Sequence, residues 1–83
     1  MYEVLIENRA RKQSLAFPQT QLDRILEAIV RLAENPRPVG ARKLSDRPGW
    51  RVRVGDYRVL YTIDDAARMV RVYRIAHRRE VYR

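Results

Sequence analysis

The chain has 83 residues, with no cysteine, one histidine and only three glycines. The absence of cysteine excludes disulfides, thiol catalysis and cysteine-ligated zinc, and it fits a reducing compartment. A lone histidine does not make a metal-ligand set, and no glycine-rich phosphate loop is present. We therefore expect no metal and no cofactor, so any catalysis should be metal-free.

Long apolar runs are also missing. No segment approaches the roughly 18 apolar residues of a membrane span. The N-terminal sequence MYEVLIENRA has no positively charged leader before an apolar stretch, so we expect a cytoplasmic protein. An apolar fraction of 46% is enough for a folded core, and the length predicts a single domain over residues 1–83.

Acidic residues are scarce in the second part of the chain. Residues 1–36 hold five basic and five acidic side chains, whereas residues 37–83 hold thirteen basic and five acidic ones. The net charge of +8 therefore comes from the second part. This distribution indicates a polyanionic partner, which is nucleic acid, an acidic protein segment or an anionic surface.

The first part of the chain has the pattern of a strand followed by two helices. Residues 2–6 favour a short strand, residues 9–16 a weak polar helix, and Phe17-Pro18 a break. A second helix follows, because apolar residues recur at the spacing of one helical face. These residues are Leu22, Ile25, Leu26, Ile29, Leu32 and Ala33. The sequence NPRP ends the helix, and residues 39–49 read as a basic loop.

From Trp50 the apolar period changes to two. Gly55-Asp56 fits a two-residue hairpin turn, which places Arg53 opposite Arg58 and Arg51 opposite Leu60. One face then carries Trp50, Val52, Val54, Tyr57, Val59, Tyr61 and Ile63, and the other carries Arg51, Arg53, Arg58, Leu60 and Thr62.

A turn at residues 64–67 and a third strand over residues 69–76 complete a meander. The predicted fold class is α+β: an N-terminal strand, a helical hairpin and then an antiparallel β-meander, with the helices packed on one face of the sheet.

The arginine-bearing face and the C-terminal tail HRREVYR carry the candidate chemistry. Like charges directly opposite each other destabilise a sheet, so Arg53 facing Arg58 would be relieved by a bound phosphate. The alternative is an ordinary solvated face. A lone histidine such as His77 is more often structural, and Tyr82 alone is more often a packing residue.

Metal-free RNA cleavage fits these residues. The RNA 2′-OH is itself the nucleophile, so the protein must supply only a proton acceptor, a proton donor and cations for the crowded phosphorane. Arginine supplies cations but is a poor base at pH 7, which leaves His77 and Tyr82 as the titrating groups.

The segments NPRP, WRVRVGDYRVLYTID and IAHRREVYR, in this order of elements, resemble the RelE/ParE superfamily of bacterial and archaeal toxins from type II toxin-antitoxin systems. The RelE-like branch cleaves mRNA in the ribosomal A site. The resemblance implies a RelE-like fold and places that branch's functional side chains at Arg51, Arg53, Arg58, Arg78 and Tyr82.

One feature departs from that branch. Arg51 and Arg53 stand where it typically has lysines, one of which takes the 2′-OH proton. His77 is the candidate for that role, as histidine is in some relatives. The predicted catalytic residues are Arg58, His77, Arg78 and Tyr82, and the predicted RNA-binding residues are Arg51, Arg53, Lys43, Arg79 and Arg83.

Two alternatives stay open. The similar ParE-like branch inhibits DNA gyrase through a protein-binding surface, and a degenerate toxin would bind its antitoxin with little activity. The set of Arg58, Arg78 and Tyr82 favours the nuclease. The expected partners are a cognate antitoxin with an acidic or amphipathic segment, mRNA and the ribosome.

Overall fold

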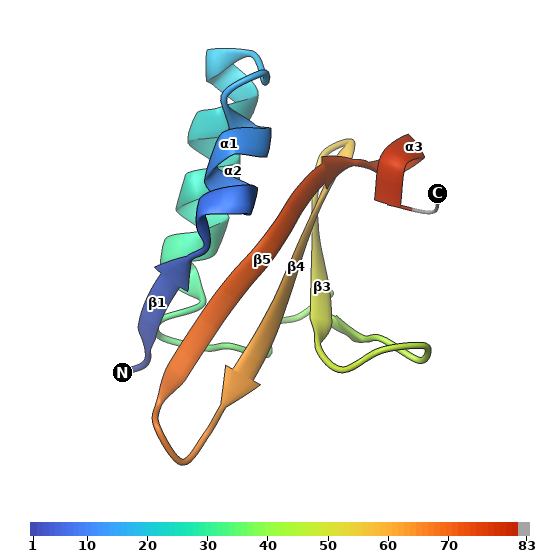
Figure 1. The fold of residues 1–83 in the computed structure, drawn as a ribbon. Coiled ribbons are helices and arrows are strands. Elements are labelled where there is room, and N and C mark those ends of the chain that lie inside the picture. The colour runs from blue at the N-terminus through green and yellow to red at the C-terminus, as the bar shows by residue number, and fades with distance from the viewer. Residues whose placement is uncertain (82–83) are drawn as a thin grey trace.

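A computed structural model describes residues 1–81 of the chain (Figure 1). The elements in order are β1 (Glu3–Ile6), α1 (Asn8–Ser14), α2 (Gln19–Arg31), β2 (Arg42–Lys43), β3 (Trp50–Val54), β4 (Tyr57–Asp64), β5 (Met69–His77) and α3 (Arg78–Val81). The predicted α+β order of a strand, a helical hairpin and a meander is confirmed. Within the described residues, none of the helices has the length and apolar character needed to cross a membrane.

The five strands form one sheet in the order β1-β5-β4-β3-β2. The β3–β4 hairpin has the predicted register, with Arg53 opposite Arg58 and Arg51 opposite Leu60. β5 continues the antiparallel meander, and β1 joins its free edge in parallel. The parallel pairing links residues more than sixty positions apart, so no local pattern indicates it.

Helices α1 and α2 lie together on one side of the sheet, as Figure 1 shows. The stripe of α2 packs there against β3 and β4, as predicted, and α1 packs against β5. The buried core cluster consists of Ala10, Ile25, Ile29, Leu32, Val54, Val59, Tyr61, Val70, Val72 and Ile75. Leu26 is an exception, because it is 40% exposed. It follows Ile25 by one residue, a rotation of about 100° around the helix, which turns it to the margin of the stripe.

The basic loop predicted over residues 39–49 contains a short strand, so that prediction is wrong in part. In β2, Arg42 pairs with Arg51 and Lys43 with Trp50. The Leu44 N–H then donates to the Gly49 carbonyl oxygen at 2.9 Å, which closes the β2–β3 loop. A two-residue strand exists only through this pairing, and the surrounding turn residues hide it in the sequence.

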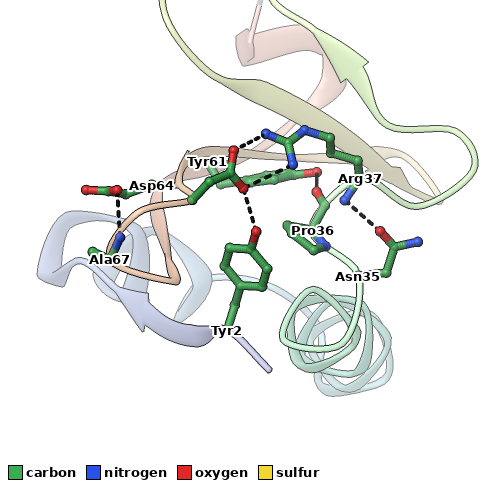
Figure 2. A network of polar contacts seen from close by, with 8 residues as sticks. Tyr2, Asn35, Pro36, Arg37, Tyr61, Asp64 and Ala67 are labelled. Atoms are coloured by element: carbon green, nitrogen blue, oxygen red, sulfur yellow. Dashed lines mark hydrogen bonds and ion pairs between the residues drawn. The ribbon is translucent and has the colours of Figure 1, made fainter.

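The NPRP segment after α2 is tied to the β4–β5 turn, as Figure 2 shows. The Tyr61 hydroxyl donates to the Pro36 carbonyl oxygen at 2.7 Å, and burial raises the pKa of Tyr61 to about 12. Arg37 pairs with Asp65 at 2.9 Å, and the Tyr2 hydroxyl donates to the same carboxylate. The hydrogen bond from Arg37 and, to a smaller extent, the one from Tyr2 lower the pKa of the Asp65 carboxyl. These contacts fix the end of α2 against the sheet.

The backbone conformation and close packing of Gly49 predict that alanine is tolerated less well there than at Gly40. The φ of Gly49 is +119°, and a Cβ there would lie 2.7 Å from the Tyr61 carbonyl oxygen. Gly40 also has a positive φ, of +95°, but a Cβ there would meet no atom within 4 Å. Both alanine variants carry backbone strain of about 1–3 kcal/mol, and only Gly49→Ala adds a backbone clash. We expect chemical denaturation to show a clearly larger loss for Gly49→Ala, and equal losses would contradict the close approach of this loop.

Candidate functional site

The candidate site lies on the sheet face turned away from α1 and α2. In β4 and β5, Arg58 is opposite Ala76 and Leu60 is opposite Arg74. We call this surface the open face; its central side chains are Arg51, Arg53, Arg58, Leu60, Arg74 and Ala76. The β2–β3 loop and α3 project on this side of the sheet, away from α1 and α2 (Figure 1).

Arg58 is buried at the centre of the open face. It is 7% exposed, and its neighbours Leu60 and Ala76 are each 2% exposed. None of the three belongs to the core cluster beneath the helices. The α3 helix contacts both β4 and β5 on this side. The arginine is therefore not a side chain on a solvated strand, which was the alternative reading of the sequence.

The guanidinium of Arg58 has few partners. Its Nη1 donates to the Tyr57 carbonyl oxygen at 3.3 Å, and its buried Nε has no hydrogen-bond partner among residues 1–81. None of the ion pairs found in this part of the chain includes it. A buried cation without a counter-ion is costly, so this position is suited to an anionic ligand.

A pocket of about 520 Å³ lies between the β2–β3 loop and the sheet, and it reaches the open face at Arg51 and Leu60. Its lining residues are Arg42, Lys43, Leu44, Ser45, Asp46, Arg47, Arg51 and Leu60. This lining includes four cationic side chains and one carboxylate. The carboxylate of Asp46 pairs with Arg47 at 3.2 Å, and this contact lowers the pKa of Asp46. The pocket therefore keeps a positive excess.

Other predicted site residues lie at the end of the open face. Arg53 is exposed, and its Nε donates to the Gly55 carbonyl oxygen at 3.1 Å. The Arg78 N–H donates to the Asp56 carbonyl oxygen at 2.7 Å, which attaches α3 to the β3–β4 turn. The side chains of Arg78 and Arg79 are exposed. The fold thus brings the start of the tail beside the hairpin arginines. Predicted residues Tyr82 and Arg83 lie outside the described part of the chain.

His77 occupies a different environment from Arg58. It pairs with Tyr57, whose side chain packs on the helix side of the sheet. The two rings meet edge to face with centroids 5.5 Å apart, and Tyr57 also contacts Phe17 at 4.5 Å. The His77 Nδ1 accepts a hydrogen bond from the Arg79 backbone N–H at 3.3 Å. The structure therefore does not bring His77 to the open face.

Sequence reasoning missed several residues of the site. Arg42 and Arg47 enter it through β2 and its loop, and Arg74 enters through the pairing of β5 with β4. The register of β5 shifts at a bulge between Leu60 and Tyr61. Because of this bulge, the alternation of apolar and polar residues does not predict which β5 side chains lie on each face of the sheet. The turn at residues 64–67 predicts only that β5 runs antiparallel to β4.

Known families and structures can now be compared with this geometry. The family model described as the ParE toxin of the type II toxin-antitoxin system parDE matches residues 4–82. No curated protein matches the chain significantly.

Solved toxin-antitoxin structures are similar over nearly the whole chain. A chain of the RelBE2 complex from Mycobacterium tuberculosis is 28% identical with a TM-score of 0.82, covering 92% of this chain and 96% of that one. An E. coli RelE mutant in complex with a RelB antitoxin peptide is 28% identical with a TM-score of 0.76, covering 98% and 90%. The archaeal RelE-RelB complex from Pyrococcus horikoshii is 24% identical with a TM-score of 0.80, covering 93% and 94%, and this likeness concerns the fold.

The family match spans almost the entire chain, and solved toxin structures share its fold over nearly their whole length. As the sequence predicted, the chain belongs to the RelE/ParE superfamily and is a toxin of a type II toxin-antitoxin system.

Proposed function

We propose that this toxin is a metal-independent endoribonuclease that cleaves mRNA at the ribosome through attack of the RNA 2′-OH. The observation that carries the proposal is Arg58, a buried cation at the centre of a strongly basic face that forms no ion pair with any of residues 1–81. Negative charge accumulates on the scissile phosphate as the phosphorane forms. A preorganised guanidinium stabilises that charge without further reorganisation.

The remaining predicted residues have roles that follow from their positions. Arg78 begins α3 at the end of the open face, where it would be the second cation at the reacting phosphate. Arg51 and Lys43 line the pocket, and exposed Arg53 and Arg79 lie at the end of the open face. We assign these four, together with Arg83, to the phosphates on either side of the cleaved bond.

Proton transfer requires a titrating side chain at the reacting oxygens. His77 lies on the helix side of the sheet, so Tyr82 is the titrating candidate that the family resemblance carries over. We propose that Tyr82 exchanges a proton with the reacting oxygens and that His77 positions the tail through its contact with the Arg79 N–H.

His77→Gln separates these two roles. We expect a loss of about 1 kcal/mol, which is roughly 4–8 °C in thermal midpoint for a domain of this size, because the ring contact with Tyr57 is lost. The pH dependence of single-turnover cleavage should keep its shape. A profile flattened near neutrality would instead assign the proton transfer to His77, as the sequence indicated.

A cognate antitoxin is part of the proposal. The relatives from M. tuberculosis and P. horikoshii were solved as complexes with their antitoxins. We propose that an acidic or amphipathic antitoxin segment neutralises the basic open face here. The product of a small adjacent gene should co-purify with this chain, and its failure to bind would remove support for this partner.

Gyrase inhibition is the alternative, because the matching family model describes a ParE toxin. The resemblance associates the ParE-like branch with binding to gyrase rather than with RNA chemistry. A buried arginine such as Arg58, which has no carboxylate partner among residues 1–81, has a clear use in stabilising a phosphorane, whereas a protein-binding surface does not require one.

A translating extract distinguishes these functions. We expect new in-frame mRNA ends when the purified protein is added, and no effect on supercoiling by purified gyrase. Intact mRNA together with blocked supercoiling would support the ParE-like alternative. Intact mRNA and active gyrase would support the degenerate toxin.

A further inference from the structure

Within residues 1–81, every buried side-chain nitrogen or oxygen without a hydrogen bond lies on β4 or β5. These atoms are Arg58 Nε, Tyr73 Oη and Arg74 Nε. Buried polar groups are normally paired, so several unpaired donors in one region indicate a ligand that is absent here. Arg58 belongs to the predicted site, whereas Arg74 and Tyr73 do not.

Strand pairing makes Arg74 a close neighbour of Arg58. Because Arg58 is opposite Ala76 and Leu60 is opposite Arg74, the two arginines are diagonal neighbours on the same face. Such residues are about 7–8 Å apart in an antiparallel pair, which lets two long guanidinium side chains reach one anion. Neither arginine belongs to an ion pair found within residues 1–81.

The head group of Arg74 is held in place by the tail. Its Nη2 donates to the Glu80 carbonyl oxygen at 2.8 Å, which connects β5 to α3. This contact occupies one donor and leaves the buried Nε unpaired. The guanidinium is thus preorganised, which lowers the entropy cost of binding an anion.

Tyr73 extends the same region toward the pocket. Its hydroxyl lies near Arg47, which lines the pocket, and both Asp46 and, to a smaller extent, Tyr73 raise the pKa of Arg47. The hydroxyl forms no hydrogen bond of normal geometry among the described residues. It is therefore available as a donor near Arg47.

We propose that Arg74 and Arg58 together bind a single RNA phosphate, with the Tyr73 hydroxyl as a donor toward the neighbouring nucleotide. This inference rests on the proposed RNA-cleaving function and adds Arg74 to the phosphate-binding arginines of that site. Two guanidinium groups without a carboxylate repel each other, and a phosphate shared between them relieves that repulsion while pairing both Nε atoms.

Inorganic phosphate is the first probe, because its binding is measured without cleavage. In an NMR titration of the purified chain, the Nε–H signals of Arg58 and Arg74 should shift together with one dissociation constant. Arg74→Gln should weaken phosphate binding by about tenfold or more, as loss of a charged hydrogen bond does. The matched control is Arg71→Gln, which removes the same charge from an exposed arginine of β5 that lies 3.9 Å from Glu7.

A short RNA with a 2′-deoxy nucleotide at the cleavage site is the second probe. Arg74→Gln should weaken its binding while leaving the salt slope close to that of the parent chain, because Arg58 still contacts the shared phosphate, and Arg71→Gln should change neither. If Arg74→Gln fails to fold because α3 is released, Arg74→Lys replaces it. Lysine can still reach the Glu80 carbonyl oxygen but has no guanidinium fork, so phosphate should bind severalfold more weakly.

The outcomes separate this inference from the proposed function. Unshifted Arg74 signals, or equal effects of Arg74→Gln and Arg71→Gln, would overturn the shared phosphate site even in an active nuclease. Joint shifts in a protein that leaves mRNA intact would support the phosphate site and contradict the nuclease.

Discussion

Replacing Arg58 with alanine is expected to reduce single-turnover RNA cleavage by about a hundredfold or more, as removal of one preorganised donor does in other enzymes. The guanidinium is buried, lacks a carboxylate partner among residues 1–81 and faces Arg53 across the hairpin. Its interaction with phosphate strengthens as negative charge builds in the transition state. The substitution should therefore change the rate of cleavage more than the affinity for RNA.

The same substitution should not unfold the protein. Removal of a buried cation relieves like-charge repulsion, which offsets the small cavity left behind, so the free energy of unfolding should be unchanged or slightly higher. Arg78→Ala should likewise lose activity without unfolding. Exposed Arg53→Ala is the matched control, and it should lose mainly affinity. Full activity of Arg58→Ala with unchanged toxicity would point to a protein target.

RNA binding is expected to weaken steeply with salt, which is the second large effect. Each neutralised phosphate of a single strand contributes a slope of about −0.7 in a plot of log K against log salt. One phosphate for each of Lys43, Arg51, Arg53 and Arg58 gives a slope of about −2.8, and contacts from Arg79 and Arg83 would make it steeper. Affinity for a non-cleavable RNA should then fall about 50-fold between 50 and 200 mM salt.

Gyrase binding is the comparison for this measurement, because a protein interface depends less on counterion release. A response of RNA binding that stays flat between low and moderate salt would contradict the assignment of the open face to RNA. The variant Lys43→Gln should lower the slope by about one contact while leaving the fold intact, since Lys43 is exposed in β2.

Local signals predicted much of the fold. The Gly55-Asp56 turn and the alternation around it gave the hairpin register, and the 3.6-residue period gave the buried side of α2. Long-range contacts were not predictable in this way. The parallel pairing of β1 with β5 and the short β2 depend on partners distant in sequence.

The candidate site likewise contains some residues that local sequence predicts and others that only tertiary contacts bring together. Arg51, Arg53 and Arg58 were placed together because they share a hairpin, whereas His77 was selected by its residue type and its position beside Arg78. The observed pairing of β5 with β4 puts His77 on the helix side and Arg74 on the open face. The burial of Arg58 also depends on tertiary structure, since no strand pattern distinguishes it from an exposed arginine.

The mechanism of mRNA cleavage is tested most directly on ribosomes programmed with two mRNAs that differ in one oxygen atom. One carries ribonucleotides throughout, and the other has a 2′-deoxy nucleotide at the mapped cleavage site. We expect the first to be cut to a product ending in a 2′,3′-cyclic phosphate, and the second to remain intact at that position, because its nucleophile is missing. Cleavage of both mRNAs at the same rate would contradict 2′-OH attack, and cleavage of neither would contradict the nuclease itself.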